Sequence, residues 1–175
     1  MTRIYVDATT LVSLGQVGEL ELLGAFDGTV AIPDAVRTEV TEEPARTNLD
    51  RFVDDRDVLT GPVETDWTED ALRVLDATEP GSDVRVLEAV LGATDEAAGE
   101  DDIAVGLISD DRRLRTVAEG FGATVTGTFG VVVRAAISDK YFSQSQAKRV
   151  VRRIDSHGLH LTGELREQAV GEADG

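Results

Sequence analysis

Short apolar runs alternate with segments of helical periodicity along most of the chain. The runs at residues 4–6, 29–32 and 103–109 have the length and composition of buried strands, and the last has the continuous apolar character of a central parallel strand. The run at 123–128 predicts a final strand. The segment at 57–63, which closes on a Gly-Pro pair and one valine, is compatible with a short edge strand.

Helices are predicted where apolar residues recur three or four positions apart and where capping residues or glycines mark the ends. A capping pattern starts at Thr68, Pro33 suits a first helical position, and Ser82 or Asp83 is a natural N-cap. We expect an acidic loop at 94–102. The segments predicted to contain helices are 8–14, 19–26, 33–40, 44–53, 68–77, 79–93, 112–121, 130–137, 143–155 and 162–170.

The alternation of strands and helices through residue 126 predicts an α/β fold with a parallel sheet flanked by helices. The sequence contains no internal repeat and no low-complexity tract. We therefore expect one domain, with its α/β part over residues 1–138. C-terminal helices over 139–170 should pack on the same domain, and residues 171–175 should form a frayed tail.

The composition excludes several classes of protein and site. The chain has 175 residues, enough for one domain with a substantial core. It contains no cysteine, which excludes disulfides, thiolate zinc sites and cysteine nucleophiles. No apolar stretch approaches the ~20 residues that cross a bilayer, and the N-terminus lacks the pattern of a signal peptide. We expect a cytoplasmic protein with no membrane contact.

The chain is strongly acidic. It has 34 Asp and Glu residues against 17 Lys and Arg residues, a formal net charge of −17. The regular periodicity and the hydrophobic fraction of 41% argue against disorder. Concentrated salt shortens the Debye length to ~3 Å at 1 M and so screens such self-repulsion. We interpret the acidity as adaptation to a halophilic habitat, and it then says little about partners.

Several acids recur where strands end or helices begin. Asp7 follows the first predicted strand, and Asp110 and Asp111 follow the predicted central strand. The carboxyl ends of parallel strands lie along one edge of a sheet, where ligands bind, so these side chains should converge. Asp83, at the start of a helix, and Glu39, on the helix after the second strand, can reach the same edge.

A cluster of carboxylates needs a counter-charge, because two like charges 4 Å apart cost about 4 kcal/mol at an effective dielectric of 20. Oxygen ligands without His or Cys favour Mg²⁺ or Mn²⁺ over Zn²⁺. Such ions activate water and stabilise the leaving oxygen of a phosphodiester. Phosphodiester hydrolysis is therefore the chemistry that this acid pattern favours.

Each acid also has an ordinary structural interpretation. Asp83 alone suits a helix cap, Glu39 alone suits a solvated helix residue, and Asp110 and Asp111 alone suit a turn and a cap. A phosphate-handling receiver-type regulator also gathers aspartates at strand ends, but this chain lacks a well-placed lysine after its last strands. The order and placement of the acids together favour a site.

At these positions the chain resembles the PIN-domain nucleases, the fold of VapC-type toxins, in a branch with a longer C-terminal helical segment. "IYVDATTLVSLGQVGELELL" carries the branch's first aspartate at Asp7 and a hydroxyl residue at Thr9. "VAIPDAVRTEV" carries Glu39, and "LISDDRRLRTVAEGFGATVTGTFGVVVRAA" places the family's Ser/Thr-x-Asp on Ser109 and Asp111. "GLHLTGELREQAV" is similar to the branch's closing helix.

The resemblance implies a three-layer α/β/α PIN-like domain and a metal-dependent ribonuclease. Asp7, Asp83 and Asp111 would hold Mg²⁺ or Mn²⁺, and Glu39 would help directly or through water. Thr9 or Ser109 would position a ligand or water, and Asp110 would support the ligands from behind. The substrate would be single-stranded RNA. A role as the toxin of a toxin–antitoxin pair, with an antitoxin protein as partner, and homodimerisation are further implications.

The third acidic motif departs from the branch. That position is often a glutamate directly after glycine, whereas "PGSD" places Asp83 one residue later with a side chain one methylene shorter. This departure motivates an alternative, a non-catalytic PIN-like module that binds RNA or a protein.

Two basic clusters relieve the acidity locally. "RRLR" places Arg112, Arg113 and Arg115 beside the proposed metal ligands, and we expect these residues to contact RNA phosphates. "KRVVRR" at 148–153 forms a basic stripe on a predicted helix. That stripe is either a backbone-contacting patch or a solvated face whose arginines pair with acids.

Overall fold

A four-stranded parallel sheet forms the centre of the protein. The structure, a computed structural model, describes residues 1–99, 103–137 and 144–156. The strand order is β2-β1-β3-β4, and β1 pairs with β3 along its whole length, from Thr2 opposite Ala104 to Val6 opposite Ile108. The strands are β1 (Thr2–Val6), β2 (Thr29–Ala31), β3 (Ala104–Ile108) and β4 (Thr124–Thr126).

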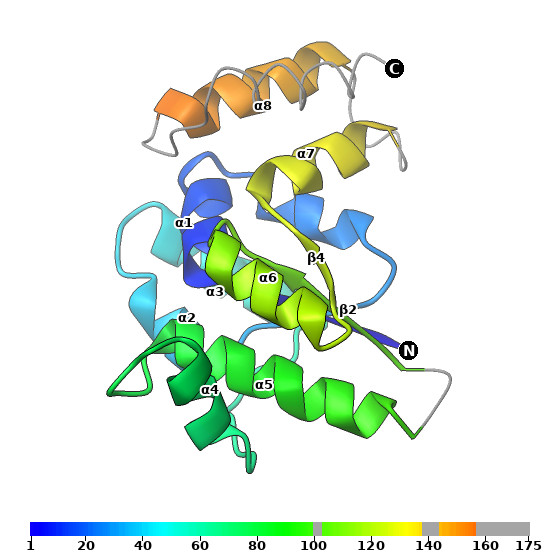
Figure 1. Cartoon of the computed structure of the whole chain (residues 1–175). Helices are drawn as coiled ribbons and strands as arrows, with labels where there is room; N and C mark the ends of the chain where they lie inside the picture. Colours follow the sequence, from blue (N-terminus) through cyan, green and yellow to red (C-terminus); the bar gives the residue numbers. More distant parts are fainter. Residues whose placement is uncertain (100–102, 138–143, 157–175) are drawn as a thin grey trace.

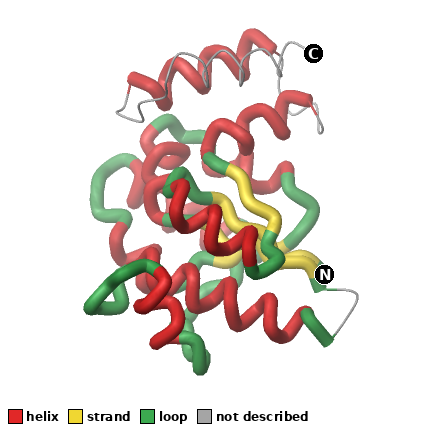
Figure 2. The backbone as a smooth tube through the Cα atoms, viewed as in Figure 1, coloured by secondary structure: helices red, strands yellow, loops and turns green. Residues whose placement is uncertain are grey.

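Helices occupy both sides of this sheet (Figures 1 and 2). Their bounds are α1 (Ala8–Gln16), the 3₁₀ helix η1 (Leu20–Ala25), α2 (Asp34–Glu39), α3 (Ala45–Asp55), α4 (Thr68–Val74), α5 (Ser82–Ala97), α6 (Arg112–Gly120), α7 (Thr128–Ile137) and α8 (Gln144–Ser156).

The two faces of the sheet are covered by different helices. On one face α5 contacts β1 and β3, and α6 contacts β3, β4 and α5. On the other side α7 contacts η1, both contact α1, and α8 packs on α7 and α1. The apolar faces of these elements are buried, as Leu11, Leu22, Val90 and Leu107 illustrate. The expected parallel sheet between two helical layers is confirmed.

The order in which strands are added to the sheet reverses at β1. From β1 the chain moves outward to β2, and it then returns past β1 to β3 and continues to β4. In open α/β sheets a crevice forms where the strand order reverses, outside the carboxyl ends of the strands. The topology therefore places a crevice where β1 and β3 end.

Several boundaries differ from those predicted. The segment at 57–63 contributes one isolated bridge, Leu59 to Ala31, in place of a strand. The acidic loop expected from residue 94 starts later, because α5 continues through Ala97. The N-cap of α5 is Gly81, so neither Ser82 nor Asp83 caps it.

Thr68 does not cap α4, because its hydroxyl group is hydrogen-bonded to Glu88. The N-cap of α4 is Trp67, and the Thr68 hydroxyl donates to a carboxylate oxygen of Glu88 at 2.7 Å. The predicted helix at 162–170 and the tail at 171–175 lie outside the described residues. No helix in the described ranges is long and apolar enough to cross a membrane.

Glu88 of α5 is almost fully buried and is held by three neighbours. Thr65 and Thr68 donate to its Oε1 at 3.0 and 2.7 Å, and Arg85 Nη1 lies 2.8 Å from its Oε2. Burial by itself raises the pKa of Glu88, but the hydrogen bonds from Thr68, Arg85 and Thr65 outweigh it and hold the pKa below its ordinary value. The carboxylate thus ties α5 to the start of α4.

Candidate functional site

Asp7 lies at the carboxyl end of β1 and begins α1. Its backbone N–H donates to Ile108 O at 2.9 Å, which continues the pairing of β1 with β3. Its Oδ1 accepts from Ala8 N at 2.8 Å, and its Oδ2 accepts from the Ser109 hydroxyl at 2.8 Å. The residue is only 6% exposed. An acid is thus fixed in the predicted crevice with both oxygens oriented.

Ser109 connects the ends of β1 and β3. It is fully buried, and its hydroxyl oxygen also accepts from Asp111 N at 3.1 Å. Asp111 in turn caps α6, because its Oδ1 accepts from Leu114 N at 3.0 Å. This chain of hydrogen bonds fixes Asp7 and Asp111 relative to one another, and Asp111 is exposed to solvent.

Asp83 joins these two acids from α5. It is exposed in the first turn of the helix, where its Oδ1 accepts from Val84 N at 2.9 Å. Burial raises the pKa of Asp7, the hydrogen bonds from Ser109 and Ala8 oppose this, and the negative charges of Asp111 and Asp83 raise the pKa further. Asp111 and Asp83 are thus near enough for their charges to act on the carboxyl group of Asp7. The end of β1 and the starts of α5 and α6 each contribute one acid to this region.

Glu39 and Thr9 are the remaining predicted site residues, and both are exposed. Glu39 is the exposed last residue of α2, and it is not among the charges that raise the pKa of Asp7. Thr9 is exposed in the first turn of α1. On α1 the buried hydroxyl belongs instead to the neighbouring Thr10, which sequence reasoning missed.

Asp110 accepts hydrogen bonds from the first residue of α7. Its Oδ1 accepts from Thr128 N at 2.8 Å, and its Oδ2 accepts from the Thr128 hydroxyl, which lies 3.1 Å from the Thr10 hydroxyl. A Cβ atom at Gly127 would lie 2.9 Å from Asp110 Oδ1, so this close approach suits glycine. Asp110 therefore anchors α7 to the end of β3.

We expect Asp110→Ala to destabilise the protein by about 1 kcal/mol, the usual cost of removing a side chain that caps a helix start. Urea unfolding monitored by circular dichroism measures the change. Asp110→Asn retains one carbonyl acceptor and should lose less. Equal stability of Asp110→Ala and the wild type would contradict the anchoring role.

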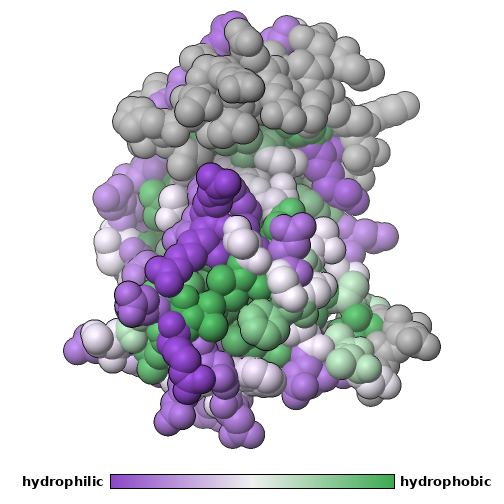
Figure 3. All heavy atoms as spheres, viewed as in Figure 1, coloured by the Kyte–Doolittle hydropathy of each residue, from purple (hydrophilic) through white to green (hydrophobic). Residues whose placement is uncertain are grey.

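The three arginines of the "RRLR" cluster have different surroundings. Arg115 is half-buried, and its Nη1 donates to Ser109 O at 2.8 Å, which supports the turn that carries the acids. Arg113 Nη2 donates to Val74 O at 2.8 Å. Arg112 is exposed on the first turn of α6, next to Asp111. On the face that carries α6 and β4, hydrophilic residues border a central apolar area (Figure 3).

The donors at this edge suit a hard cation by their chemistry. All are carboxylate or hydroxyl oxygens, and a cation would offset the mutual repulsion that raises the pKa of Asp7. Within the described residues no three His, Cys, Asp or Glu side chains lie close enough together to hold one metal ion in their present orientations. Asp83 and Asp111 are exposed, so their carboxylates are open to solvent at this edge.

Comparison with known proteins bears on the resemblance noted above. No curated protein matches the sequence significantly. The model of the DUF3368 family, which is described as a PIN domain, matches residues 3–174. Because this match spans nearly the whole chain, the protein belongs to the PIN-domain family, whose members are generally nucleases.

Proposed function

We propose that the protein is a metal-dependent ribonuclease that hydrolyses phosphodiester bonds in single-stranded RNA. The observation that carries the proposal is the buried Asp7, hydrogen-bonded to Ser109 and influenced by the charges of Asp83 and Asp111, at the edge where the strand order reverses. Membership of a family of nucleases supports the same chemistry.

Asp7, Asp83 and Asp111 are the residues that would hold Mg²⁺ or Mn²⁺, and Glu39 would assist from the end of α2. When bound, the ion would polarise the phosphate and make water more acidic. Asp7 supplies a fixed acceptor because Ser109 and Ala8 orient both its oxygens. The exposed Asp83 and Asp111 leave the edge open to a flexible single strand.

The neighbouring side chains would position these acids and the substrate. Ser109 holds Asp7 and the backbone of Asp111, and Arg115 holds Ser109. Arg112 and Arg113, exposed at the start of α6, would contact RNA phosphates next to the acids. Thr9, exposed on the first turn of α1, would orient water or phosphate. Asp110 would act indirectly, because it anchors α7.

The biological setting that we propose is that of a toxin in a toxin–antitoxin pair, with an antitoxin protein as partner and a homodimer as the assembly. The resemblance to VapC-type toxins motivates this proposal. We also propose a halophilic origin from the net charge of −17, and a cytoplasmic location because the chain contains no cysteine. Copurification with the product of a small neighbouring gene would test the partner.

The second candidate is a PIN-like module that binds RNA without cleaving it. Two observations favour it: the displaced acid in "PGSD", and the absence of a ready-made set of three metal ligands within the described residues. RNA binding without cleavage, at every metal concentration tested, would select this function.

Cleavage of a fluorescently labelled single-stranded RNA tests the proposal directly. The wild-type protein should cleave it with Mn²⁺ or Mg²⁺ and lose activity when EDTA removes the metal. The assay should be run in dilute and in concentrated salt, because high salt screens the repulsion between RNA and an acidic protein. No cleavage in any of these conditions would rule out the nuclease assignment.

A further inference from the structure

The basic segment at 148–153 lies on α8, whose apolar and basic residues face different directions. The apolar residues are buried where the helix packs on α7 and α1, namely Ala147, Val150, Val151 and Ile154. The helix carries four cationic residues and a single acid, Asp155. A net positive helix stands apart in a chain with a formal net charge of −17, and packing does not account for it.

One arginine of this helix pairs with an acid. Arg153 Nη2 donates to Val17 O at 2.6 Å, and its Nη1 lies 3.7 Å from Glu19 Oε1. Arg153 therefore attaches α8 to the C-terminal end of α1. For this residue, the interpretation of a helix face whose arginines pair with acids is correct.

Arg149 and Arg152 have no such partner. Both are exposed, and a spacing of three residues places them on the same side of α8. Neither forms an ion pair or a side-chain hydrogen bond with another residue in the described ranges. Acids outnumber cations two to one in this chain, yet these two guanidinium groups remain available to an external anion. We call Arg149 and Arg152 the α8 arginine pair.

Helix α1 connects the acidic edge to the helix that carries this pair. Asp7 is the N-cap of α1, and Val17, which accepts from Arg153, is its C-cap. These two ends are about 15 Å apart at ~1.5 Å per residue. Figure 1 shows α8 lying across the far end of α1. One helix length therefore separates the proposed metal ligands from the point where α8 is attached.

The surface of α1 between these ends carries no charge, because the helix contains no acidic or basic residue. Thr9, Ser13 and Gln16 recur at helical spacing and are exposed or half-buried, so they form an uncharged polar line along α1. At its far end Glu19 is paired with α8, and Glu42 accepts from Gln16 Nε2 at 3.5 Å. A strand of phosphates that follows α1 therefore meets hydroxyl and amide groups.

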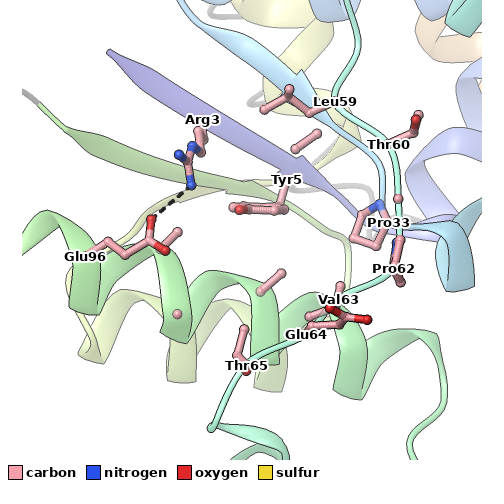
Figure 4. A pocket seen from close by; sticks show the side chains of 15 residues that line it. Arg3, Tyr5, Pro33, Leu59, Thr60, Pro62, Val63, Glu64, Thr65 and Glu96 are labelled. Carbon is pink, nitrogen blue, oxygen red and sulfur yellow. Dashed lines mark hydrogen bonds and ion pairs between the residues drawn. The ribbon is translucent and has the colours of Figure 1, made fainter.

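The cavity between the sheet and α5 offers no comparable site for phosphate (Figure 4). Arg3 is the one cation among its described lining residues, and its Nη1 pairs with Glu96 Oε2 at 3.2 Å. Glu64 adds a second carboxylate to the lining. A phosphate there would meet more acids than cations. The direction along α1 is therefore the more favourable of the two for an RNA strand that starts at the acidic edge.

We propose that the α8 arginine pair binds backbone phosphates of the RNA strand whose scissile phosphodiester lies at the acidic edge, with the intervening nucleotides along α1. This inference rests on the proposed function for its substrate. Phosphates in a stacked strand repeat every ~3.4 Å, so the length of α1 corresponds to about four nucleotides. Arginine suits the role, because its planar guanidinium group can donate two parallel hydrogen bonds to one phosphate.

Fluorescence anisotropy of a labelled single-stranded RNA of about twelve nucleotides measures binding, and EDTA prevents cleavage during the titration. We expect Arg149→Gln/Arg152→Gln to bind this RNA about tenfold more weakly than the wild type at low salt, because two charge-assisted contacts are lost. The slope of log K against log salt concentration should become shallower by about 0.7 for each contact, about 1.4 in the double variant.

The matched control for the single variants Arg149→Gln and Arg152→Gln is Arg73→Gln. It removes one positive charge from an exposed arginine on α4, which lies at the opposite end of the molecule from α8 (Figure 1). Arg73→Gln should keep the affinity and the salt dependence of the wild type, whereas each α8 variant should lose part of both. Thermal unfolding at the same salt concentration shows that every variant is folded.

Cleavage in Mn²⁺ separates phosphate binding from a structural role of α8. Arg149→Gln/Arg152→Gln should raise KM for the longer RNA about tenfold and leave kcat unchanged, because the pair contacts the strand away from the scissile bond. A dinucleotide has its single phosphodiester at the acidic edge and cannot reach α8, so both proteins should cleave it at the same rate. Damage to the fold would slow the cleavage of both substrates.

Wild-type affinity and salt dependence in the folded double variant would overturn the proposal, and so would an equal loss in Arg73→Gln. A polyglutamate peptide that binds as tightly as RNA, with the same dependence on the α8 arginine pair, would assign this surface to an acidic protein and overturn its assignment to RNA. Cleavage by the wild type with unchanged RNA binding by the double variant would reject the α8 contact alone. Binding that depends on the pair, without cleavage in any condition, would reject the nuclease alone.

Discussion

Asp7→Asn should reduce the rate of RNA cleavage about a hundredfold or more and leave the fold intact. Asparagine keeps an oxygen that can accept from Ala8 N, and the Ser109 hydroxyl can accept from the new amide, so the hydrogen bonds around residue 7 can persist. What is lost is the negative charge, which a hard cation requires. Initial rates on labelled RNA at saturating Mn²⁺ measure the effect.

The matched control for Asp7→Asn is Asp57→Asn, which neutralises an exposed aspartate in the turn that follows α3. It should cleave at the wild-type rate. Asp111→Asn is the second test, because its amide oxygen can still accept from Leu114 N and keep the cap of α6. Unchanged cleavage by folded Asp7→Asn and Asp111→Asn would remove the site from this edge of the sheet.

Glu88→Ala should lower the free energy of unfolding by about 3 kcal/mol. This value is the lower end of the range for breaking a buried ion pair, because the partner Arg85 is partly exposed. The variant leaves the hydroxyls of Thr65 and Thr68 without their shared acceptor. Urea unfolding at neutral pH measures the change. Glu21→Ala, which breaks an exposed ion pair with Arg56, is the control and should cost less than about 1 kcal/mol.

The contribution of Glu88 should also depend on pH. Its pKa is lower in the folded protein than in the unfolded chain, so its stabilisation is fully present above the unfolded pKa of about 4.3 and is lost as the pH falls through the folded value. The difference in stability between the wild type and Glu88→Gln should therefore shrink below about pH 4. A difference that grows on acidification would contradict the contacts assigned to Glu88.

The C-terminal end of α5 was not predicted correctly from the local sequence pattern. The acidic composition after Thr94 predicts a loop, yet the helix continues through Ala97. Glu96 on this last turn pairs with Arg3 of β1, 93 residues away in the sequence. Thr68 shows the same limit, because its capping pattern is overridden by the distant Glu88. In both cases the observed contact joins segments that are far apart in the sequence.

The sequence alone determined the alternation of strands and helices, the parallel sheet and the meeting of Asp7 with Asp111, because apolar periodicity is a local property and parallel strands end at one edge. Only the tertiary structure shows which segments the adjacent Asp110 and Asp111 contact. One accepts hydrogen bonds from α7 and the other caps α6 beside Asp7. The Ser/Thr-x-Asp spacing distinguishes the two positions in the sequence, but the contacts of each side chain are set by the remote segments that pack around it.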